Sequence, residues 1–264
     1  MKENWMRVRA AQAGVELAAA RFVDHRFSPH RHGTYAVGRT VGGVQSFSYL
    51  GASHHSLAGD VFVLHPDELH DGRPGTDAGY SYRIAYVLPA LIAMASGGNH
   101  LPFISSPVSR NAILARAVTA VLDLDMTGDE DLGHAEAIAA LTDALTMFSD
   151  APRSPTTQVD VPMMHRIREQ IADLVPRRIG VAELEREHGI DRFTLARQFR
   201  SLFGVTPRRF ITLRRLDMVA TSIQHGCGLA NAALAAGFAD QSHMTRAFRD
   251  AFGMSPGQWR KLQL

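Results

Sequence analysis

An eleven-residue pattern occurs twice near the C-terminus, and it constrains the fold more than any other feature of the sequence. The copies are Arg197–Pro207 and Arg246–Pro256, 49 residues apart, and both read R-x-F-R-x-x-F-G-x-[ST]-P. Phenylalanines at helical spacing followed by glycine predict a short helix with an apolar inner face and a C-terminal stop. Two such basic helices predict two equivalent units that bind a polyanion, with DNA as the expected partner.

Each copy separates into two faces when it is wound at about 100° per residue. The predicted inward residues are Leu195, Phe199 and Leu202 in the first copy and Met244, Phe248 and Ala251 in the second. Gly204 and Gly253 stand where a left-handed residue ends a helix. Thr206 and Ser255, each followed by proline, supply the N-cap of a following helix.

A shorter helix is predicted upstream of each copy. The first is Val181–His188 before Gly189, and the second is Leu229–Ala236 before Gly237. A helix, a glycine turn and a second helix with a basic outer face form a helix-turn-helix, which therefore occurs twice. The helical spacer Pro207–Gln224, about 27 Å long, would hold the two recognition helices about one turn of B-DNA apart.

The outward residues of the two recognition helices are the candidates for DNA contact. Arg197 and Arg246 lie at the centre of each outward face, where bidentate contact with guanine is favoured. Arg200 and Arg249 are expected to meet phosphates, with solvated surface as the alternative. The predicted base-contacting set is Phe193, Thr194, Arg197, Ser242, His243 and Arg246. For the apolar Phe193, packing against the neighbouring unit stays open.

Composition and charge favour a globular protein of at least two domains. Of the 264 residues, 45% are hydrophobic and 20% are charged. Residues 160–264 carry 16 Lys/Arg and 10 Asp/Glu, against 12 and 16 in the rest. A single cysteine, Cys227, fits a reducing compartment. Without a signal-peptide pattern at Met1–Trp5 or an apolar run long enough to span a bilayer, we expect a cytoplasmic protein with no membrane contact.

Residues 20–88 predict β-structure, and the segment after about residue 107 predicts a helical pair. Runs rich in Val, Phe, Tyr and Thr at Tyr35–Val41, Val44–Tyr49, Val61–Leu64 and Tyr80–Val87 predict strands of a barrel or sandwich. Gly42-Gly43 predicts a hairpin turn. In residues 107–149, two apolar stripes predict two helices, with Ser109 or Asn111 as N-cap. These helices either pair with a second subunit or pack within the chain. Residues 150–160, rich in proline and hydroxyl side chains, predict a linker.

The segment from residue 160 onward resembles the DNA-binding domain of the AraC/XylS family of bacterial transcription regulators. The string Ala235–Arg249 and the terminal Phe252–Pro256 carry the resemblance. It implies an α+β multidomain protein: a cupin-like barrel (1–106), a dimerising helical pair (107–149), a linker (150–160) and an all-α domain with two helix-turn-helix units (161–264). It also implies promoter DNA, a small-molecule effector, RNA polymerase and a second copy as partners, with activation as the more usual outcome.

Histidines and one tyrosine mark the candidate effector site in the barrel. His30, His32 and Tyr35, with the later His70, resemble the positions that line cupin pockets. On a strand, His30 and His32 would point to the same side, and with His70 they could ligate a metal. No carboxylate follows the His-x-His pair, so an organic effector is preferred, with structural histidines as a further alternative. Nothing identifies a catalytic acid, base or nucleophile, so we expect no enzyme and no cofactor. The alternatives are a metal-dependent cupin enzyme with a DNA-binding tail, and a regulator that senses no ligand.

Overall fold

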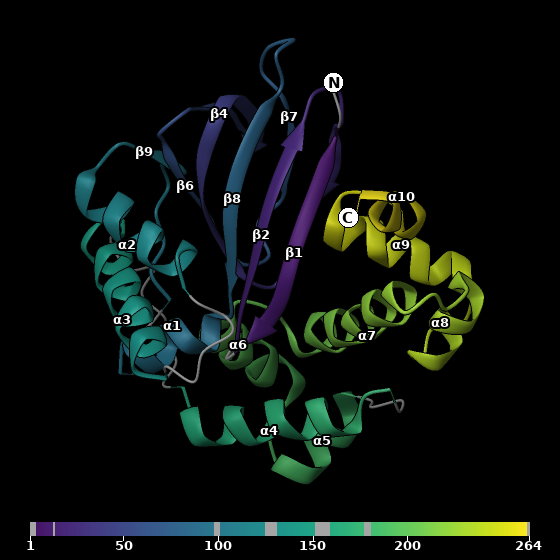
Figure 1. Ribbon diagram of the computed structural model, residues 1–264. Helices are drawn as coiled ribbons and strands as arrows, with labels where there is room; N and C mark the ends of the chain where they lie inside the picture. The colour runs from purple at the N-terminus through teal and green to yellow at the C-terminus, as the bar shows by residue number, and fades with distance from the viewer. Residues whose placement is uncertain are drawn as a thin grey trace.

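The computed structural model describes residues 4–12, 14–97, 101–124, 131–150, 159–176 and 181–262. The strands are β1 (Trp5–Gln12), β2 (Val15–Phe22), β3 (Phe27–His30), β4 (Tyr35–Tyr49), β5 (Ala52–Leu57), β6 (Val61–Leu64), β7 (His70–Pro74), β8 (Tyr80–Val87) and β9 (Val108–Ser109). The helices are α1 (Pro89–Ala95), α2 (Ala112–Leu122), α3 (Asp131–Met147), α4 (Val161–Leu174), α5 (Val181–His188), α6 (Arg192–Phe203), α7 (Pro207–Gln224), α8 (Leu229–Ala235), α9 (Gln241–Phe252) and α10 (Pro256–Leu262). The predicted division into a β-rich part and a helical part is confirmed (Figure 1).

A long strand, β4, joins two antiparallel sheets into the barrel. Its first half pairs with β8 and β6 in the order β1-β2-β8-β4-β6-β9, and its second half pairs with β5 and β7. The prediction of a hairpin at Gly42-Gly43 is wrong, because the strand runs through both glycines. Gly43 has φ 71°, and the register shifts between Thr40 and Gly42. A bulge of this kind bends a strand, which lets β4 serve both sheets.

The helical pair covers one face of the sheet, as Figure 1 shows at the left of the barrel. The apolar stripes of α2 and α3, including Val118 and Leu141, are buried against sheet residues such as Val37 and Val63. The two helices therefore pack their apolar faces within the chain, which was one of the two alternatives that the sequence left open. The predicted linker lies mostly outside the described residues. Its last residue, Asp160, caps α4 by accepting a hydrogen bond from the Met163 amide at 2.9 Å.

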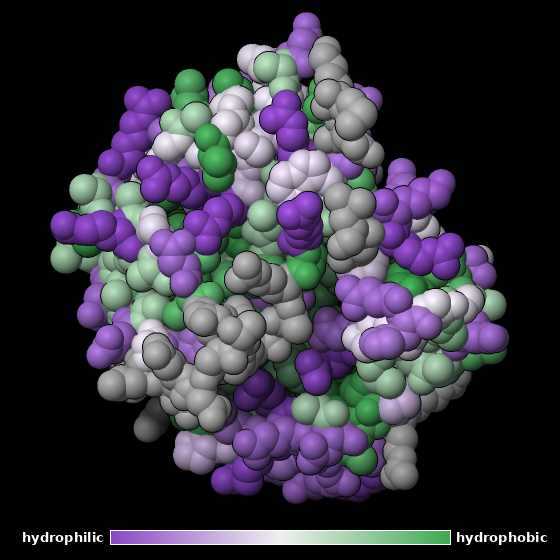
Figure 2. Space-filling model, viewed as in Figure 1, coloured by the Kyte–Doolittle hydropathy of each residue, from purple (hydrophilic) through white to green (hydrophobic). Residues whose placement is uncertain are grey.

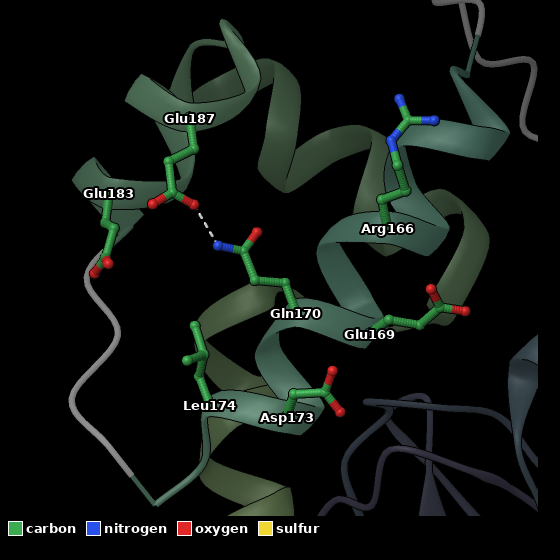
Figure 3. A pocket seen from close by; sticks show the side chains of 7 residues that line it. All are labelled: Arg166, Glu169, Gln170, Asp173, Leu174, Glu183 and Glu187. Atoms are coloured by element: carbon green, nitrogen blue, oxygen red, sulfur yellow. Dashed lines mark hydrogen bonds between the residues drawn. The ribbon is translucent and has the colours of Figure 1, made fainter.

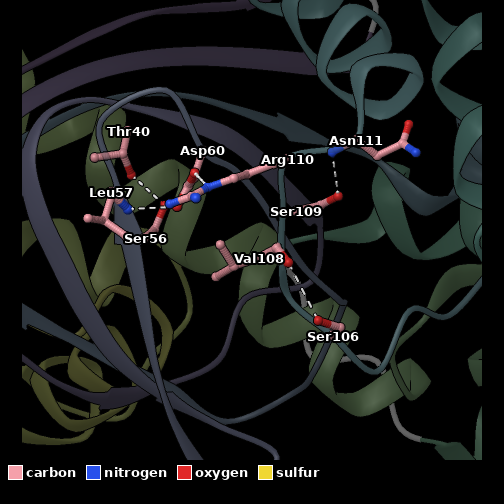
Figure 4. Close-up of polar contacts among 9 residues, drawn as sticks. All are labelled: Thr40, Ser56, Leu57, Asp60, Ser106, Val108, Ser109, Arg110 and Asn111. Carbon is pink, nitrogen blue, oxygen red and sulfur yellow. Dashed lines mark hydrogen bonds and ion pairs between the residues drawn. The ribbon is translucent and has the colours of Figure 1, made fainter.

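A buried carboxylate fixes the start of the helical pair to the barrel (Figure 4). The side chain of Asp60 is 5% exposed and accepts hydrogen bonds from Arg110 Nε at 2.7 Å and the Leu57 amide at 2.9 Å. Beside it, the hydroxyls of Thr40 and Ser56 are 2.7 Å apart. The pairing of Asp60 with Arg110 holds β9 and the N-terminus of α2 against β6.

Asn111 is the N-cap of α2, as one of the two predicted candidates. Its side-chain oxygen accepts hydrogen bonds from the amides of Ile113 at 2.8 Å and Leu114 at 3.4 Å. We predict that Asn111→Ala lowers the free energy of unfolding by about 1 kcal/mol, because two amides lose their acceptor. Asn111→Asp keeps an acceptor and should retain most of the stability. Chemical denaturation compares the two; an equal loss in both variants would contradict the capping role.

Candidate functional site

Both recognition helices have the two faces that the sequence predicts. In α6, Leu195, Phe199 and Leu202 are buried. In α9, Met244, Phe248 and Ala251 are buried. The phenylalanines pack against further aromatic rings: Phe199 lies 4.6 Å from Phe203, and Phe248 lies 4.3 Å from Phe252 between ring centroids. The apolar side of each helix is thus buried inside the protein, and the opposite side is left for contact with a partner.

The recognition helices end at the predicted glycines, and the structure shows that each helix also begins with an aspartate N-cap. Gly204 and Gly253 are left-handed, with φ 73° and 68°. Asp191 caps α6, and Asp240, 49 residues later, caps α9. The sequence repeat therefore extends further upstream than the predicted pattern, and the matching aspartates at that spacing were the available signal.

The candidate DNA-contacting side chains lie on the outer faces of α6 and α9. Phe193 is 73% exposed, which is unusual for a phenylalanine and leaves it free for contact outside its own unit. Thr194 is half-buried, and the remaining predicted residues are exposed: Arg197, Arg200, Ser242, His243, Arg246 and Arg249. Arg197 Nη2 donates to Thr194 Oγ1 at 3.3 Å. Each unit thus places one arginine of the predicted base-contacting set on an open surface.

Acidic side chains gather on α4 and α5, away from the DNA-contacting candidates. A cleft between α4 and α5 is shown in Figure 3. It is lined by Arg166, Glu169, Gln170, Asp173, Leu174, Glu183 and Glu187. In Figure 2 the region at the bottom, where Figure 1 places α4 and α5, is mainly hydrophilic. Four carboxylates against one arginine repel phosphate, so this surface is unsuited to DNA.

Three predicted effector residues, His30, His32 and His70, come together at one end of the barrel. The ring centroid of His70 lies 4.3 Å from His30 and 4.7 Å from His32. His30 is the last residue of β3, whereas His32 follows the strand, so alternation along one strand is not what unites them. We call these three residues the histidine cluster. Tyr35 lies elsewhere: its hydroxyl donates to the Pro102 carbonyl at 2.7 Å, and its ring packs against His65.

Main-chain carbonyls fix the tautomer of the histidine cluster. Nδ1 of His30, His32 and His70 lies 2.8, 2.8 and 3.0 Å from the carbonyl oxygens of Ser28, Thr34 and Glu68. A carbonyl only accepts, so each Nδ1 carries the proton and each Nε2 keeps its lone pair. Within the described part of the chain, no group of three His, Cys, Asp or Glu side chains has an arrangement that would hold a metal ion.

Burial keeps the histidine cluster neutral. Loss of solvation lowers the pKa of His30 to about 4, with the neighbouring His32 adding to the effect. It lowers the pKa of His32 and of His70 to about 3, again with contributions from the neighbouring rings. The barrel therefore presents three uncharged acceptor nitrogens at physiological pH.

The histidine cluster adjoins the end of the second recognition helix. The main-chain amides of Ser28 and Arg31 donate to the carbonyls of Gly253 and Asp250, both at 2.9 Å. The last carbonyls of a helix have no partner within the helix, so the barrel supplies partners to α9. A Cβ on Gly253 would lie 2.7 Å from Nδ1 of His30, so the close approach needs glycine in addition to the left-handed backbone.

Arg209 of α7 bridges the barrel and the second unit. Its Nη1 donates to Asp250 Oδ2 and its Nη2 donates to the Arg31 carbonyl, both at 2.6 Å. The arginine side chain is 14% exposed, and the aspartate side chain is 51% exposed. Neither this bridge nor the hydrogen bonds of β3 to α9 were expected from the sequence, because no local pattern pairs a residue near position 31 with one near 209 or 250.

We predict that Arg209→Ala loosens the docking of the second unit on the barrel. The expected loss is about 1 kcal/mol of unfolding free energy, because one partner of the ion pair is half-exposed. Hydrogen exchange of the Ser28 and Arg31 amides should become faster, whereas that of the β2–β8 ladder should not. Unchanged protection at both amides would contradict the bridging role of Arg209.

The first recognition helix also ends against the barrel. Arg200 Nη2 lies 3.8 Å from Asp67 Oδ2, and a Cβ on Gly204 would lie 2.5 Å from Pro66 Cβ. The amide of Asp67 donates to the His32 carbonyl at 2.8 Å. The histidine cluster therefore adjoins the contacts that hold both recognition helices.

A ligand-binding barrel joined to two helix-turn-helix units defines the class of ligand-responsive transcription regulators. The model of the AraC-like ligand binding domain matches residues 12–145, and a helix-turn-helix domain matches residues 184–262. The chain belongs to the AraC family of transcription regulators.

Curated relatives are regulators of the same family. The HTH-type transcriptional regulator YbfI of Bacillus subtilis is 23% identical over 92% of this chain and 90% of its own length. A putative AraC-like transcription regulator of Streptomyces antibioticus is 34% identical over 31% of this chain and 27% of its own length. The virulence regulon transcriptional activator VirF of Yersinia enterocolitica is 31% identical over 30% of each chain.

Solved structures of ToxT from Vibrio cholerae share the fold. One matches with a TM-score of 0.67 at 13% identity, over 95% of this chain and 99% of that chain. Another, with an unsaturated fatty acid bound, has a TM-score of 0.67 at 14% identity, over 97% and 98%. The predicted α+β architecture, a cupin-like barrel followed by a double helix-turn-helix domain, is confirmed.

Proposed function

We propose that both helix-turn-helix units bind promoter DNA and that an effector in the barrel changes this binding. The observation that carries the proposal is the position of the histidine cluster beside the contacts that hold α6 and α9. The base contacts we assign are Phe193, Thr194, Arg197, Ser242, His243 and Arg246, and the phosphate contacts are Arg200 and Arg249. Nε2 of His30, His32 and His70 accepts hydrogen bonds from the effector, whereas Tyr35, whose hydroxyl donates to the Pro102 carbonyl, lies apart from this group.

The effector acts by binding one arrangement of the domains better than another. Only such a difference in affinity shifts the population between arrangements. An effector that moved His32 would disturb two hydrogen bonds. One runs from the Asp67 amide to the His32 carbonyl, and the other runs from Arg209 to the carbonyl of the preceding residue, Arg31. It would thereby alter how α6 and α9 are held. The fatty acid in the ToxT structure supports ligand binding by this architecture.

The remaining assignments extend the same proposal. The sensor comprises residues 1–106, the helical pair 107–149, the linker 150–160 and the DNA-binding domain 161–264. The protein acts in the cytoplasm as a homodimer and activates transcription with RNA polymerase, without enzymatic activity. Among the described residues, no helix is long and apolar enough to cross a membrane.

Selection from a pool of randomised duplexes tests DNA reading directly. The full chain should enrich a site with two dissimilar segments about one helical turn apart, because Phe193-Thr194 and Ser242-His243 present different side chains at equivalent positions. Enrichment of a single short segment, or of no sequence, would overturn the proposal.

A further inference from the structure

Three buried polar atoms in the β-rich part of the chain have no hydrogen-bond partner among the described residues. They are the hydroxyl oxygen of Tyr80, Oε1 of Gln45 and Nε2 of His25. Tyr80 is 1% exposed and Gln45 is 8% exposed. Buried polar groups in folded proteins almost always have a partner, so each exception needs an explanation.

The three side chains belong to one neighbourhood. The ring of Phe22 lies 5.1 Å from His25 and 5.8 Å from Tyr80 between centroids. Gln45 of β4 pairs with Pro74 of β7, two residues from Gly72, so Gln45 and Gly72 lie on the same face of the sheet. This group is distinct from the histidine cluster, where every Nδ1 has a carbonyl partner.

Gly72 leaves room beside the Tyr80 hydroxyl. It is buried and pairs with Phe27 across the β3–β7 ladder. A Cβ built on Gly72 would lie 3.8 Å from the Tyr80 oxygen and 3.4 Å from Phe27 Cδ2, which is ordinary contact. A methyl group therefore fits next to this hydroxyl, and alanine at position 72 would occupy that space without strain.

The unpartnered atoms define the chemistry of what they bind. Burial raises the pKa of the Tyr80 hydroxyl, which stays a donor, while Gln45 Oε1 only accepts. Burial lowers the pKa of His25 and keeps it neutral, with Asp24 opposing the shift. A matching group therefore both donates and accepts, and gains nothing from carrying a charge. The rings of Phe22 and Phe27, 5.1 Å apart, offer apolar surface beside it.

We propose that Tyr80, Gln45 and His25 form a polar subsite for an uncharged amide or hydroxyl group carried on an apolar ligand. This inference rests on the proposed ligand-binding function of the barrel and adds the chemical class of the effector.

Calorimetric titration of the full chain with benzamide and benzoate tests the subsite. Benzamide carries a donor and an acceptor and should bind saturably; benzoate, of the same shape but charged and without a donor, should bind at least tenfold more weakly. Tyr80→Phe and Gly72→Ala should each weaken benzamide at least tenfold. The matched control is Tyr49→Phe, whose hydroxyl is already engaged by His65 Nδ1 at 2.7 Å; it should keep benzamide affinity.

Melting temperatures without a probe exclude misfolding as the reason for lost binding. Tyr80→Phe should melt at or above the wild-type temperature, because it removes an unsatisfied buried group, whereas Tyr49→Phe should melt lower. Absent benzamide binding, equal benzoate binding, or full affinity in both subsite variants would overturn the subsite and leave water as its occupant. Binding of the selected duplex by the same proteins is measured separately. If the wild-type protein does not bind the selected duplex, the proposed function is wrong. If only the subsite proposal is wrong, the wild-type protein still binds this duplex.

Discussion

Acidification from pH 7 to pH 5 should lower the free energy of unfolding by about 4 kcal/mol. His30, His65 and His70 are buried and His32 is half-buried. Loss of solvation lowers the pKa to about 4 for His30 and His65 and to about 3 for His32 and His70, so all four are neutral. The unfolded chain takes up these protons below about pH 6.5, whereas the folded chain does not. The contribution of these histidines to the free energy of unfolding is therefore fully present above pH 6.5. It is lost as the pH falls toward their pKa values in the folded protein.

Glu16 opposes this loss without cancelling it. Burial, with a contribution from Asp217, raises the pKa of Glu16 to about 7 from 4.5. Its share of stability is fully present below pH 4.5 and is lost as the pH rises through 7, so acidification restores it. Burial raises the pKa of Asp217 to about 6, so this carboxyl opposes the loss in the same way. Four histidines against two carboxyls leave a net uptake of about two protons by the unfolded chain, at most about 3 kcal/mol per pH unit. A typical domain has only about 5–15 kcal/mol to lose.

Denaturant titrations at pH 7.5, 6.5, 5.5 and 5.0 measure this dependence. His70→Gln should reduce the slope by about one proton, because it removes one buried titrating ring. His225→Gln, at an exposed position, is the matched control for replacing a histidine with glutamine. A free energy of unfolding that stays level or rises toward pH 5 would contradict the neutral, buried state of the histidine cluster.

Replacing Arg197 or Arg246 with alanine should weaken binding to the selected duplex by about tenfold to a hundredfold each, or about 1–3 kcal/mol. The reason is the loss of the bidentate contact with a guanine edge that we propose for each of these exposed arginines. Fluorescence anisotropy with the selected and a scrambled duplex measures the effect. Binding to the scrambled duplex should change much less.

Arg200→Ala and Arg249→Ala are the controls for charge. If they contact phosphate, they should weaken selected and scrambled duplexes alike and lower the salt slope by about one. Arg200, unlike Arg249, forms an ion pair with Asp67 of the barrel. Asp67→Asn removes this ion pair and should therefore strengthen binding to both duplexes. A sequence-dependent effect of Arg200 or Arg249 would contradict the assignment.

The sequence was enough for the DNA-binding domain because its signals are local. Apolar spacing, the C-terminal glycines Gly204 and Gly253, and the Thr206 N-cap each act within a few residues of one helix. The predicted helix Pro207–Gln224 has those bounds in the structure, and Leu229–Ala236 is one residue too long. The role of Gln198 was not predicted, because its partner is distant in the sequence. Gln198 is buried on α6 and accepts a hydrogen bond from the Asp160 amide at 2.9 Å.

The barrel was only partly predictable, because strands are defined by partners distant in the sequence. Val61–Leu64 and Tyr80–Val87 are apolar enough to be recognised alone and match β6 and β8. The strand β5 was missed because its exposed face carries polar residues, and β4 was divided in two because two glycines suggest a turn. The docking of α9 on β3 rests on main-chain atoms, which leave no residue pattern to read.

Sequence selection with the single variants Arg197→Ala and Arg246→Ala tests the central claim, that each recognition helix reads its own DNA segment. Each variant should lose preference at one base position, in a different segment for each, while the other segment stays as in the wild type. Loss of the same segment in both variants, or two unchanged segments in either, would contradict it.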